Sequence, residues 1–472
     1  MEGTGSPGPA GEPPAAPRLF GTSGIRQVVG SEITPSFVAD IVSAFATWLD
    51  RPGPVLVAHD YRTSSDGIAR ICAGTLQMNG VDVLEMGVLP TPGLEFNVPA
   101  LGAAAGIMVT ASHNPTEFNG LKFVGPEGLE LDRLAERAIE EAYARRARRT
   151  VAWSGVGQIR AETGGVERYL RSILEHLDRD AILSARPRVV LDCGNGTSSV
   201  VVPRLLRLLG LPFTTLNANP DGGFPGHPSE PSEENLTHLR RAVVEFGAQV
   251  GIAHDGDSDR VAFVDERGHY VPGDVALALF ARDALRSHPG ATIATSITSS
   301  SAVGDVVRSQ GGRLAVSRSG SLAVALLIRN ESAVFGGEEN GHFYFIEHQN
   351  APDGPMSAGR LLELLARERR PLSEIVAEIP NYSVVKTKIA LPAEFKLEVV
   401  RAAEAALAQE AVRIDTIDGV KAFFASSSLL IRPSGTEPIC RIFAESRDPA
   451  EARALADRGR ALVNEIVAAH KR

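Results

Sequence analysis

The sequence runs Ala105-Gly-Ile-Met-Val-Thr-Ala-Ser-His-Asn-Pro115, an apolar segment that ends in one serine flanked by polar groups. The apolar segment predicts a buried strand, and Pro115 prevents an immediate helix, so we expect Ser112 on a loop at the strand's carboxyl end. Ligands of open α/β sheets bind at that end of the strands. Ser112 therefore has the position of a nucleophile, although an ordinary turn uses the same residue types.

A second cluster, His254-Asp-Gly-Asp-Ser-Asp-Arg260, lies between two apolar, strand-like runs. Its carboxylates, Asp255, Asp257 and Asp259, alternate along the chain, and alternate positions of an extended chain share a face. Like charges held that close are unfavourable unless a hard cation with oxygen ligands offsets them. The spacing therefore predicts a divalent-cation site, with a solvated acidic turn as the alternative.

An EF-hand is a rival interpretation of this cluster, because Glu266 stands where the last ligand of such a loop would fall. However, Arg260 occupies the position that requires glycine, and the flanking runs indicate strands rather than helices. We therefore expect the carboxylates on a loop between strands.

Two further clusters contain groups that suit a sugar phosphate. The run Arg432-Pro-Ser-Gly-Thr-Glu-Pro438 combines a guanidinium, two hydroxyls and backbone N–H groups opened by a glycine, which are the parts of a phosphate-binding loop. Glu338 and Asn340, on a glycine-rich loop, offer a carboxylate and an amide to sugar hydroxyls. Either cluster alone is also compatible with a plain turn. The residues assigned to phosphate binding are Arg432, Ser434, Gly435 and Thr436.

The order and content of these clusters resemble the α-D-phosphohexomutase superfamily, the phosphoglucomutases and phosphomannomutases. The resemblance covers nearly the whole chain and implies an α/β fold, with three similar mixed α/β domains and a smaller α+β C-terminal domain around a central cleft. The motifs that carry it are Phe20-Gly-Thr-Ser-Gly-Ile-Arg26, Asp60-Tyr-Arg62, Thr110-Ala-Ser-His-Asn-Pro115, Asn119-Gly-Leu-Lys122, Asp255-Gly-Asp-Ser-Asp-Arg260, Gly337-Glu-Glu-Asn-Gly-His342 and Arg432-Pro-Ser-Gly-Thr-Glu-Pro438.

Two departures from the family pattern concern the third domain. Asn340 stands where family members often have serine, and Ser317-Arg-Ser-Gly320 keeps only part of the usual Thr-x-Val-Gly pattern. Both bear on the choice of sugar more than on activity, because an amide still bonds hydroxyls.

Length and patterning predict several domains. At 472 residues the chain is longer than one core usually supports, and apolar runs alternate with amphipathic stretches as in α/β layering. Residues 416–425 are expected to form one strand of the last domain. The expected units are a disordered tail over residues 1–17 and domains over residues 18–158, 159–266, 267–376 and 377–472, which carry the serine, aspartate, sugar and phosphate loops in that order.

Composition limits the class of protein. The formal net charge of −9 and the pI near 5.7 disfavour a general nucleic-acid binder. No run of about 18 apolar residues occurs, so we expect no membrane span. The cysteines, Cys72, Cys193 and Cys440, lie far apart in the sequence, as expected of reduced thiols in a cytoplasmic protein.

The resemblance implies a mechanism in which Ser112 carries a phosphoryl group. Mg²⁺ would be bound by the three aspartates and by an oxygen of the phosphorylated Ser112, and it would act as a Lewis acid. Lys122, assisted by His113 or His342, would move the protons of the sugar hydroxyl. Arg26 and Arg260 would supply further positive charge at this centre. Arg26 is assigned to the catalytic residues, and Arg260 is assigned to substrate binding.

The implied activity is phosphoryl transfer between C1 and C6 of glucose and/or mannose phosphate, through a hexose 1,6-bisphosphate that acts as intermediate and activator. A phosphoglucosamine mutase is the alternative, and the amino sugar is expected to be a poorer substrate unless an acidic group such as Glu339 faces C2. A serine hydrolase is disfavoured because no Gly-x-Ser-x-Gly motif surrounds Ser112. A sugar-phosphate sensor is the non-enzyme alternative. Small-molecule hexose phosphates are the expected partners, of a monomer or homodimer.

Overall fold

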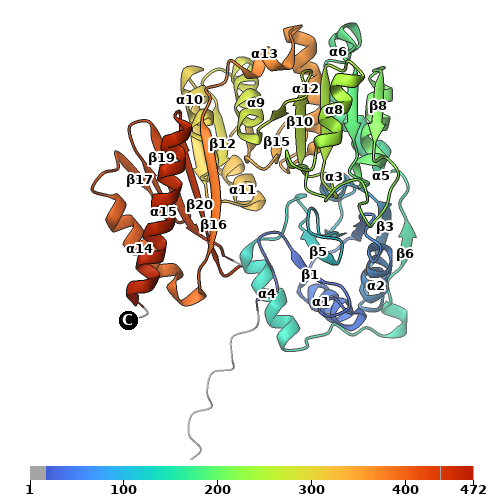
Figure 1. Cartoon of the computed structure of the whole chain (residues 1–472). Helices are drawn as coiled ribbons and strands as arrows, with labels where there is room; N and C mark the ends of the chain where they lie inside the picture. Colours follow the sequence, from blue (N-terminus) through green and yellow to red (C-terminus); the bar gives the residue numbers. More distant parts are fainter. Residues whose placement is uncertain (1–17, 436, 471–472) are drawn as a thin grey trace, which may run out of the picture.

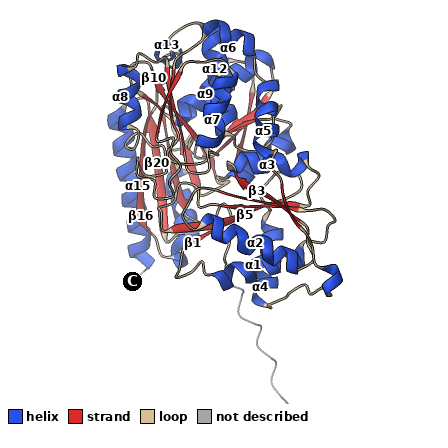
Figure 2. Cartoon of the chain, turned by 90° about the vertical axis from the view of Figure 1, so that its right-hand side faces the viewer, coloured by secondary structure: helices blue, strands red, loops and turns tan. Residues whose placement is uncertain are grey.

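The computed structural model describes residues 18–435 and 437–470 and contains four sheets, each covered by helices. The four units follow one another around the molecule in chain order, from the blue first unit to the red last one (Figure 1). Helices lie on the outside of the sheets in the turned view as well (Figure 2). The expected α/β class with a different C-terminal unit is confirmed. The tail expected over residues 1–17 lies outside the described residues.

The first sheet has six strands in the order β1-β5-β4-β2-β3-β6. Strands β4, β2, β3 and β6 are parallel, whereas β5 and β1 are antiparallel to their neighbours. Since β6 pairs with β3, this sheet extends past the expected boundary at residue 158. The elements are β1 (Ile25–Val28), α1 (Pro35–Trp48), β2 (Val55–His59), α2 (Ser65–Met78), β3 (Val83–Val88), α3 (Thr91–Ala100), β4 (Ala105–Val109), β5 (Phe118–Val124), α4 (Arg133–Ala144), η1 (Trp153–Gly155) and β6 (Ile159–Ala161).

The second sheet has five strands in the order β11-β10-β9-β7-β8. Its β9 and β10 form an antiparallel hairpin, and both strands are apolar and buried along their length. The elements are α5 (Gly165–Glu175), α6 (Arg179–Ala185), β7 (Val189–Asp192), α7 (Ser198–Leu208), β8 (Phe213–Leu216), α8 (Thr237–Glu245), β9 (Val250–His254), β10 (Val261–Asp265) and β11 (Tyr270–Val271).

The third sheet has four strands in the order β13-β12-β14-β15, of which only β15 is antiparallel to its neighbour. The second and third units share one continuous apolar core, in which Phe263 of β10 packs against Phe280 of α9. The elements are α9 (Gly273–Ser287), β12 (Thr292–Ser296), α10 (Ser301–Ser309), β13 (Arg313–Ser317), α11 (Ser321–Glu331), β14 (Phe335–Gly337), β15 (Phe343–Phe345), α12 (Gly354–Glu368) and α13 (Leu372–Val376).

The fourth sheet is entirely antiparallel, in the order β16-β20-β19-β18-β17. The single strand expected over residues 416–425 is present only as the shorter β18, because Gly419 has a φ of 83° and turns the chain between β17 and β18. The elements are β16 (Ser383–Ala390), η2 (Ala393–Phe395), α14 (Lys396–Leu407), β17 (Arg413–Asp415), β18 (Val420–Phe423), β19 (Ser427–Pro433), β20 (Ile439–Ser446) and α15 (Pro449–His470).

A polar contact region joins the fourth unit to the third. The buried ammonium Nζ of Lys421 donates to the carbonyls of Ile297 and Ser299 at 2.9 and 2.8 Å. The buried carboxylate of Glu445 accepts a hydrogen bond from the backbone N–H of Ser301 at 3.0 Å. We call this region the seam.

Within residues 18–435 and 437–470, the model contains no helix with the length and apolar character needed to cross a membrane. The three cysteines are buried as free thiols.

Candidate active site

Ser112 lies on the loop after β4, where the sequence placed it. Its φ is 49°, in the left-handed region that residues other than glycine rarely adopt, and the residue is buried. The hydroxyl Oγ donates a hydrogen bond to Oδ2 of Asp255 at 2.8 Å and lies 3.2 Å from Nδ1 of His113. The expected nucleophile of the first domain therefore points at the carboxylate loop of the second.

Arg62 holds the serine loop in this conformation. Its buried guanidinium donates hydrogen bonds at 2.6–2.9 Å to the carbonyls of Ser112, Asn114, Pro115 and Phe118. A guanidinium group suits such a set of acceptors, because it is planar and rigid and carries several N–H donors in a fixed arrangement. The backbone of the loop is thus fixed before any substrate binds.

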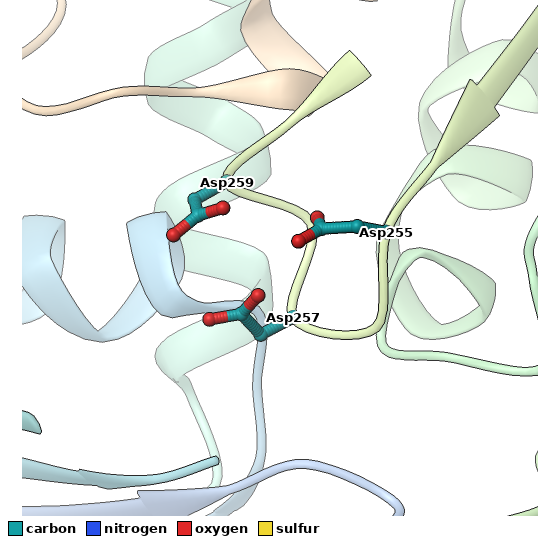
Figure 3. Close-up of side chains that lie close together, drawn as sticks. All are labelled: Asp255, Asp257 and Asp259. Carbon is teal, nitrogen blue, oxygen red and sulfur yellow. The ribbon is translucent and has the colours of Figure 1, made fainter. Parts of the chain in front are cut away.

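The three aspartates occupy the turn of the β9–β10 hairpin, in which His254 and Val261 are paired. Their carboxylates converge, with ligand oxygens within 4.8 Å of one another (Figure 3). The flanks are strands, as expected, so the EF-hand interpretation is excluded by the fold as well. Gly256 allows this turn to approach the serine loop, since a Cβ there would lie only 2.8 Å from the carbonyl oxygen of Ser112.

Lys122 supplies a counter-charge inside this cluster. Its buried Nζ donates to Oδ2 of Asp257 at 2.9 Å and to Oδ2 of Asp259 at 2.7 Å. Burial opposes the charged form, but the two carboxylates raise the pKa of Lys122 above its ordinary value. The ammonium in turn holds the pKa of Asp257 low, and that of Asp259 well below its ordinary value, against the effect of burial. Lys122 therefore carries its proton at neutral pH.

The cluster retains capacity for a further cation. Burial, together with repulsion from Asp259 and Asp257, raises the pKa of Asp255 well above its ordinary value, which marks an excess of negative charge. Oδ1 of Asp257 is buried and has no hydrogen-bond partner among the described residues. Carboxylate oxygens that converge in this way are the hard ligands that Mg²⁺ prefers. The residues present therefore fit a divalent cation.

His342 connects the aspartates to the sugar loop between β14 and β15. Its Nε2 lies 3.3 Å from Oδ1 of Asp259, and its Nδ1 lies 3.3 Å from Oε2 of Glu338. Although burial opposes the imidazolium, these carboxylates raise the pKa of His342 to about 9. Asn340 accepts a hydrogen bond from the backbone N–H of His342 at 3.3 Å. His342 is therefore a proton donor at neutral pH.

His113, unlike His342, is uncharged at neutral pH. Burial and the neighbouring guanidinium groups of Arg260 and Arg26 lower the pKa of His113 to about 2. Arg260 pairs with Glu230 at 3.0 Å, and Arg26 donates to Oδ1 of Asn114 at 3.1 Å. The imidazole beside the serine hydroxyl is therefore neutral, and a pKa this low makes it a weak base.

The phosphate loop of the fourth domain is built differently. Arg432, at the end of β19, donates through Nε to Oδ2 of Asp418 at 2.6 Å, and the backbone N–H of Ser434 donates to Ile439 at 2.9 Å. Gly435 is exposed, and its carbonyl accepts a hydrogen bond from Arg18 of the first domain at 3.2 Å. Thr436 lies outside the described residues. The loop thus reaches the surface at Gly435, where it contacts the first domain.

One hydrogen-bonded and ion-paired network joins most of the residues expected at the site, and Arg26 reaches it through Asn114. Arg432, Ser434 and Gly435 form the separate phosphate loop. Glu339 does not serve the sugar site, because its carboxylate accepts from Thr298 at 2.7 Å and lies 3.6 Å from Lys386 in the seam. The network joins Ser112, His113, Lys122, Asp255, Asp257, Asp259, Arg260, Glu338, Asn340 and His342.

Sequence reasoning missed three supporting residues. Arg62 lies in the Asp60-Tyr-Arg62 motif, and no role was predicted for it, although the nearby Asp60 was a signal for an internal ion pair. Thr91 donates to Oδ2 of Asp257 at 2.5 Å, and Ser229 donates to the carbonyl of Ser112 at 3.1 Å. Nothing in the local sequence marks these two hydroxyls, because their roles depend on contacts between distant segments.

Comparison with known proteins agrees with this architecture. Models of the phosphoglucomutase/phosphomannomutase alpha/beta/alpha domains I, II and III match residues 17–150, 167–268 and 272–382, and the model of the C-terminal domain matches residues 387–462. A "Phosphoglucomutase/phosphomannomutase" of Thermococcus kodakarensis is 36% identical, over 95% of this chain and 99% of its own. A "Probable phosphoglucosamine mutase" of Methanopyrus kandleri is 40% identical, over 93% and 96%.

A solved structure of a phosphoglucomutase/phosphomannomutase family protein from Burkholderia thailandensis has a TM-score of 0.83 and 27% identity, covering 95% of this chain and 97% of its own. The four family models match the four sheets in chain order, and the serine and aspartate loops fall within the first two matches. The chain belongs to the phosphoglucomutase/phosphomannomutase family of the α-D-phosphohexomutase superfamily.

Proposed function

We propose that this enzyme moves a phosphoryl group between the C1 and C6 hydroxyls of glucosamine phosphate, through phosphorylated Ser112 and a sugar 1,6-bisphosphate. The observation that carries the proposal is the 2.8 Å contact between Oγ of Ser112 and the carboxylate of Asp255. It supports the proposal because the hydroxyl of the first domain lies against the carboxylates of the second that would hold the cation. Phosphoryl transfer needs this pairing of a nucleophile with concentrated positive charge.

In the first half-reaction the sugar hydroxyl oxygen replaces Oγ of Ser112 on phosphorus. The bond between phosphorus and Oγ of Ser112 breaks, and a bond to the sugar hydroxyl oxygen forms. The hydroxyl proton leaves to a protein base, and Oγ regains a proton. Lys122 and His342 carry protons that they can donate, whereas His113, 3.2 Å from Oγ, is neutral and, with its pKa lowered to about 2, too weak a base to be assigned the hydroxyl proton. In the second half-reaction the other phosphate of the turned bisphosphate returns to Oγ.

Asp255, Asp257 and Asp259 would hold a magnesium ion, which when bound would neutralise charge on the transferring phosphoryl group. Arg26 and Arg260 add fixed positive charge beside it. The arrangement offsets the roughly −2 charge of a phosphoserine, which would otherwise be repelled by the aspartates.

Glucosamine is proposed over the neutral hexoses for two reasons, which reverses the preference first expected. The relative at 40% identity is named a probable phosphoglucosamine mutase. A relative from Sulfurisphaera tokodaii that is 35% identical is also named a phosphoglucosamine/phosphogalactosamine mutase.

The test is a comparison of kcat/KM for the 1-phosphates of glucosamine, glucose and mannose, with phosphorylated enzyme and Mg²⁺. We expect the highest value for glucosamine 1-phosphate and activity with the other two within about two orders of magnitude. A higher value for either neutral sugar would return the assignment to a hexose phosphate mutase. The free buried thiols accord with the further proposal of a cytoplasmic location.

A further inference from the structure

A pocket of about 540 Å³ lies beside helix α4, outside the network around Ser112. Four arginines and three glutamates line it. Its volume is within the range of roughly 300–1,000 Å³ that is common for small-molecule sites. Its lining residues take no part in the phosphoryl transfer proposed at Ser112.

The glutamates of this pocket are already engaged. Glu136 pairs with Arg133 at 2.6 Å, and Glu141 lies 3.5 Å from Arg145 outside the pocket. Glu140 accepts hydrogen bonds from the backbone N–H groups of Leu19 and Phe20 at 2.6 and 2.9 Å. Their negative charge is therefore largely compensated within the protein.

The remaining arginines are not compensated. The side chains of Arg137 and Arg318 have no ion pair or hydrogen bond within residues 18–435 and 437–470. Among the described residues, Arg18 donates only to neutral backbone carbonyls, those of Phe20 and Gly435, each at 3.2 Å. Three guanidinium groups around one cavity make it a site for a multivalent anion.

The pocket adjoins both substrate loops. Arg18 connects it to the phosphate loop at Gly435. Arg318 stands two positions before Gly320, whose N–H donates to Glu338 of the sugar loop at 3.0 Å. A Cβ at Gly320 would lie 3.5 Å from the methyl group of Thr22, so the loop between β13 and α11 meets the first domain here. Helix α4 lies where the C-terminal unit approaches the first one (Figure 1).

We propose that this pocket holds one phosphate of the sugar 1,6-bisphosphate while the intermediate turns round between the two transfers. The inference rests on the proposed function and adds a holding site to it. During the turn, the phosphate bound at Arg432 must leave that loop, and the phosphate made from the Ser112 phosphoryl group must take its place. Arg18, Arg137 and Arg318 provide an anchor beside the loop, so that the intermediate stays on the enzyme.

The test uses the full-length double variant Arg137→Ala/Arg318→Ala, which changes two exposed side chains and leaves Arg18 and the phosphate loop intact. Arg241→Ala, an exposed arginine on α8, is the matched control for loss of surface charge. Each enzyme, carrying radiolabelled phosphate on Ser112, is mixed with glucosamine 6-phosphate and with glucose 6-phosphate. The fraction of label that appears as free bisphosphate is then measured.

We expect the double variant to release roughly three- to tenfold more bisphosphate than wild type, and Arg241→Ala to match wild type. Steady-state turnover of the double variant should fall, and added glucose 1,6-bisphosphate should restore it, which would not occur with a merely damaged fold. Equal release by the double variant and wild type would overturn the holding role proposed for the pocket and leave the proposed function intact. Failure of wild-type Ser112 to take up label would overturn the proposed function together with the inference that rests on it.

Discussion

The loop of Ser112 and the loop of Arg432 are both proposed to bind phosphate, but the protein holds them in different ways. Ser112 is buried, and its backbone and hydroxyl are fixed by Arg62, Ser229 and Asp255. The phosphate loop contains an exposed glycine, Gly435, whose carbonyl contacts Arg18 of the first domain. The difference separates two tasks: a chemical step gains from groups fixed in advance, whereas a binding loop that must release and recapture a ligand has to remain accessible.

Replacing the nucleophile tests the fixed side of this comparison most directly. Ser112→Ala should lower mutase turnover by more than about four orders of magnitude while the protein stays folded, because the hydroxyl is the proposed phosphoryl carrier. The measurement is intact-protein mass before and after incubation with a hexose 1,6-bisphosphate. Equal phosphorylation of the variant and wild type would show that the carrier is another residue.

The aspartates allow a sharper test, because Lys122 pairs with Asp257 and Asp259 but the pKa of Asp255 is raised. Asp257→Asn and Asp255→Asn should each reduce Mg²⁺-dependent turnover by about two to three orders of magnitude. Without metal, Asp257→Asn should also cost about 3 kcal/mol of unfolding free energy, because it leaves a buried ammonium poorly paired.

Asp255→Asn should cost less, because it relieves repulsion. Denaturant unfolding in chelator compares the two variants. Equal stabilities would contradict the distinct roles assigned to these carboxylates. On sequence grounds alone, relief of repulsion would be expected at Asp257 as well, but its contact with Lys122 rules that out.

Arg432→Ala tests the accessible side and should act mainly on binding. A charge-assisted contact to phosphate contributes about 1.5–3 kcal/mol, so KM should rise roughly 10- to 150-fold. The transfer of label from phosphorylated Ser112, measured at saturating substrate, should change far less than KM. A fall in that rate with an unchanged KM would place Arg432 in the chemical step and remove the contrast between the loops.

The smallest expected effect concerns the seam between the third and fourth units. Asp274 of α9 lies there, where its carboxylate accepts a hydrogen bond from the backbone N–H of Ser300 at 2.6 Å. Burial, with repulsion from Glu339, raises the pKa of Asp274 to about 7. Because its folded pKa lies above the unfolded value, the stability it contributes is present at low pH and is lost as pH rises towards and through 7. Asp274→Asn should therefore flatten the decline in Tm between pH 5 and 8. An unchanged profile would show that this carboxyl does not titrate with folding.

The fold and the location of the site could be predicted from the sequence because both depend on local signals. Apolar runs that end just before Ser112 and just before Asp255 mark strand ends, and strand ends mark ligand sites. The roles of Arg62 and Lys122 could not be read in this way, since each bonds groups far away in the chain. Glu339 shows the same limit: it is one position from Glu338, yet its contacts lie in the seam.

The seam also has a meaning in the order of synthesis. Every residue of the network around Ser112 precedes the fourth sheet in the chain, whereas Lys421 and Glu445, which attach the phosphate loop's domain, come from that sheet. Domains of a nascent chain generally fold as units, the N-terminal ones first. The serine loop and its carboxylates are thus synthesised before the fourth domain exists. Under the proposed function, the last 90 or so residues would add substrate binding to a unit that can already accept phosphate.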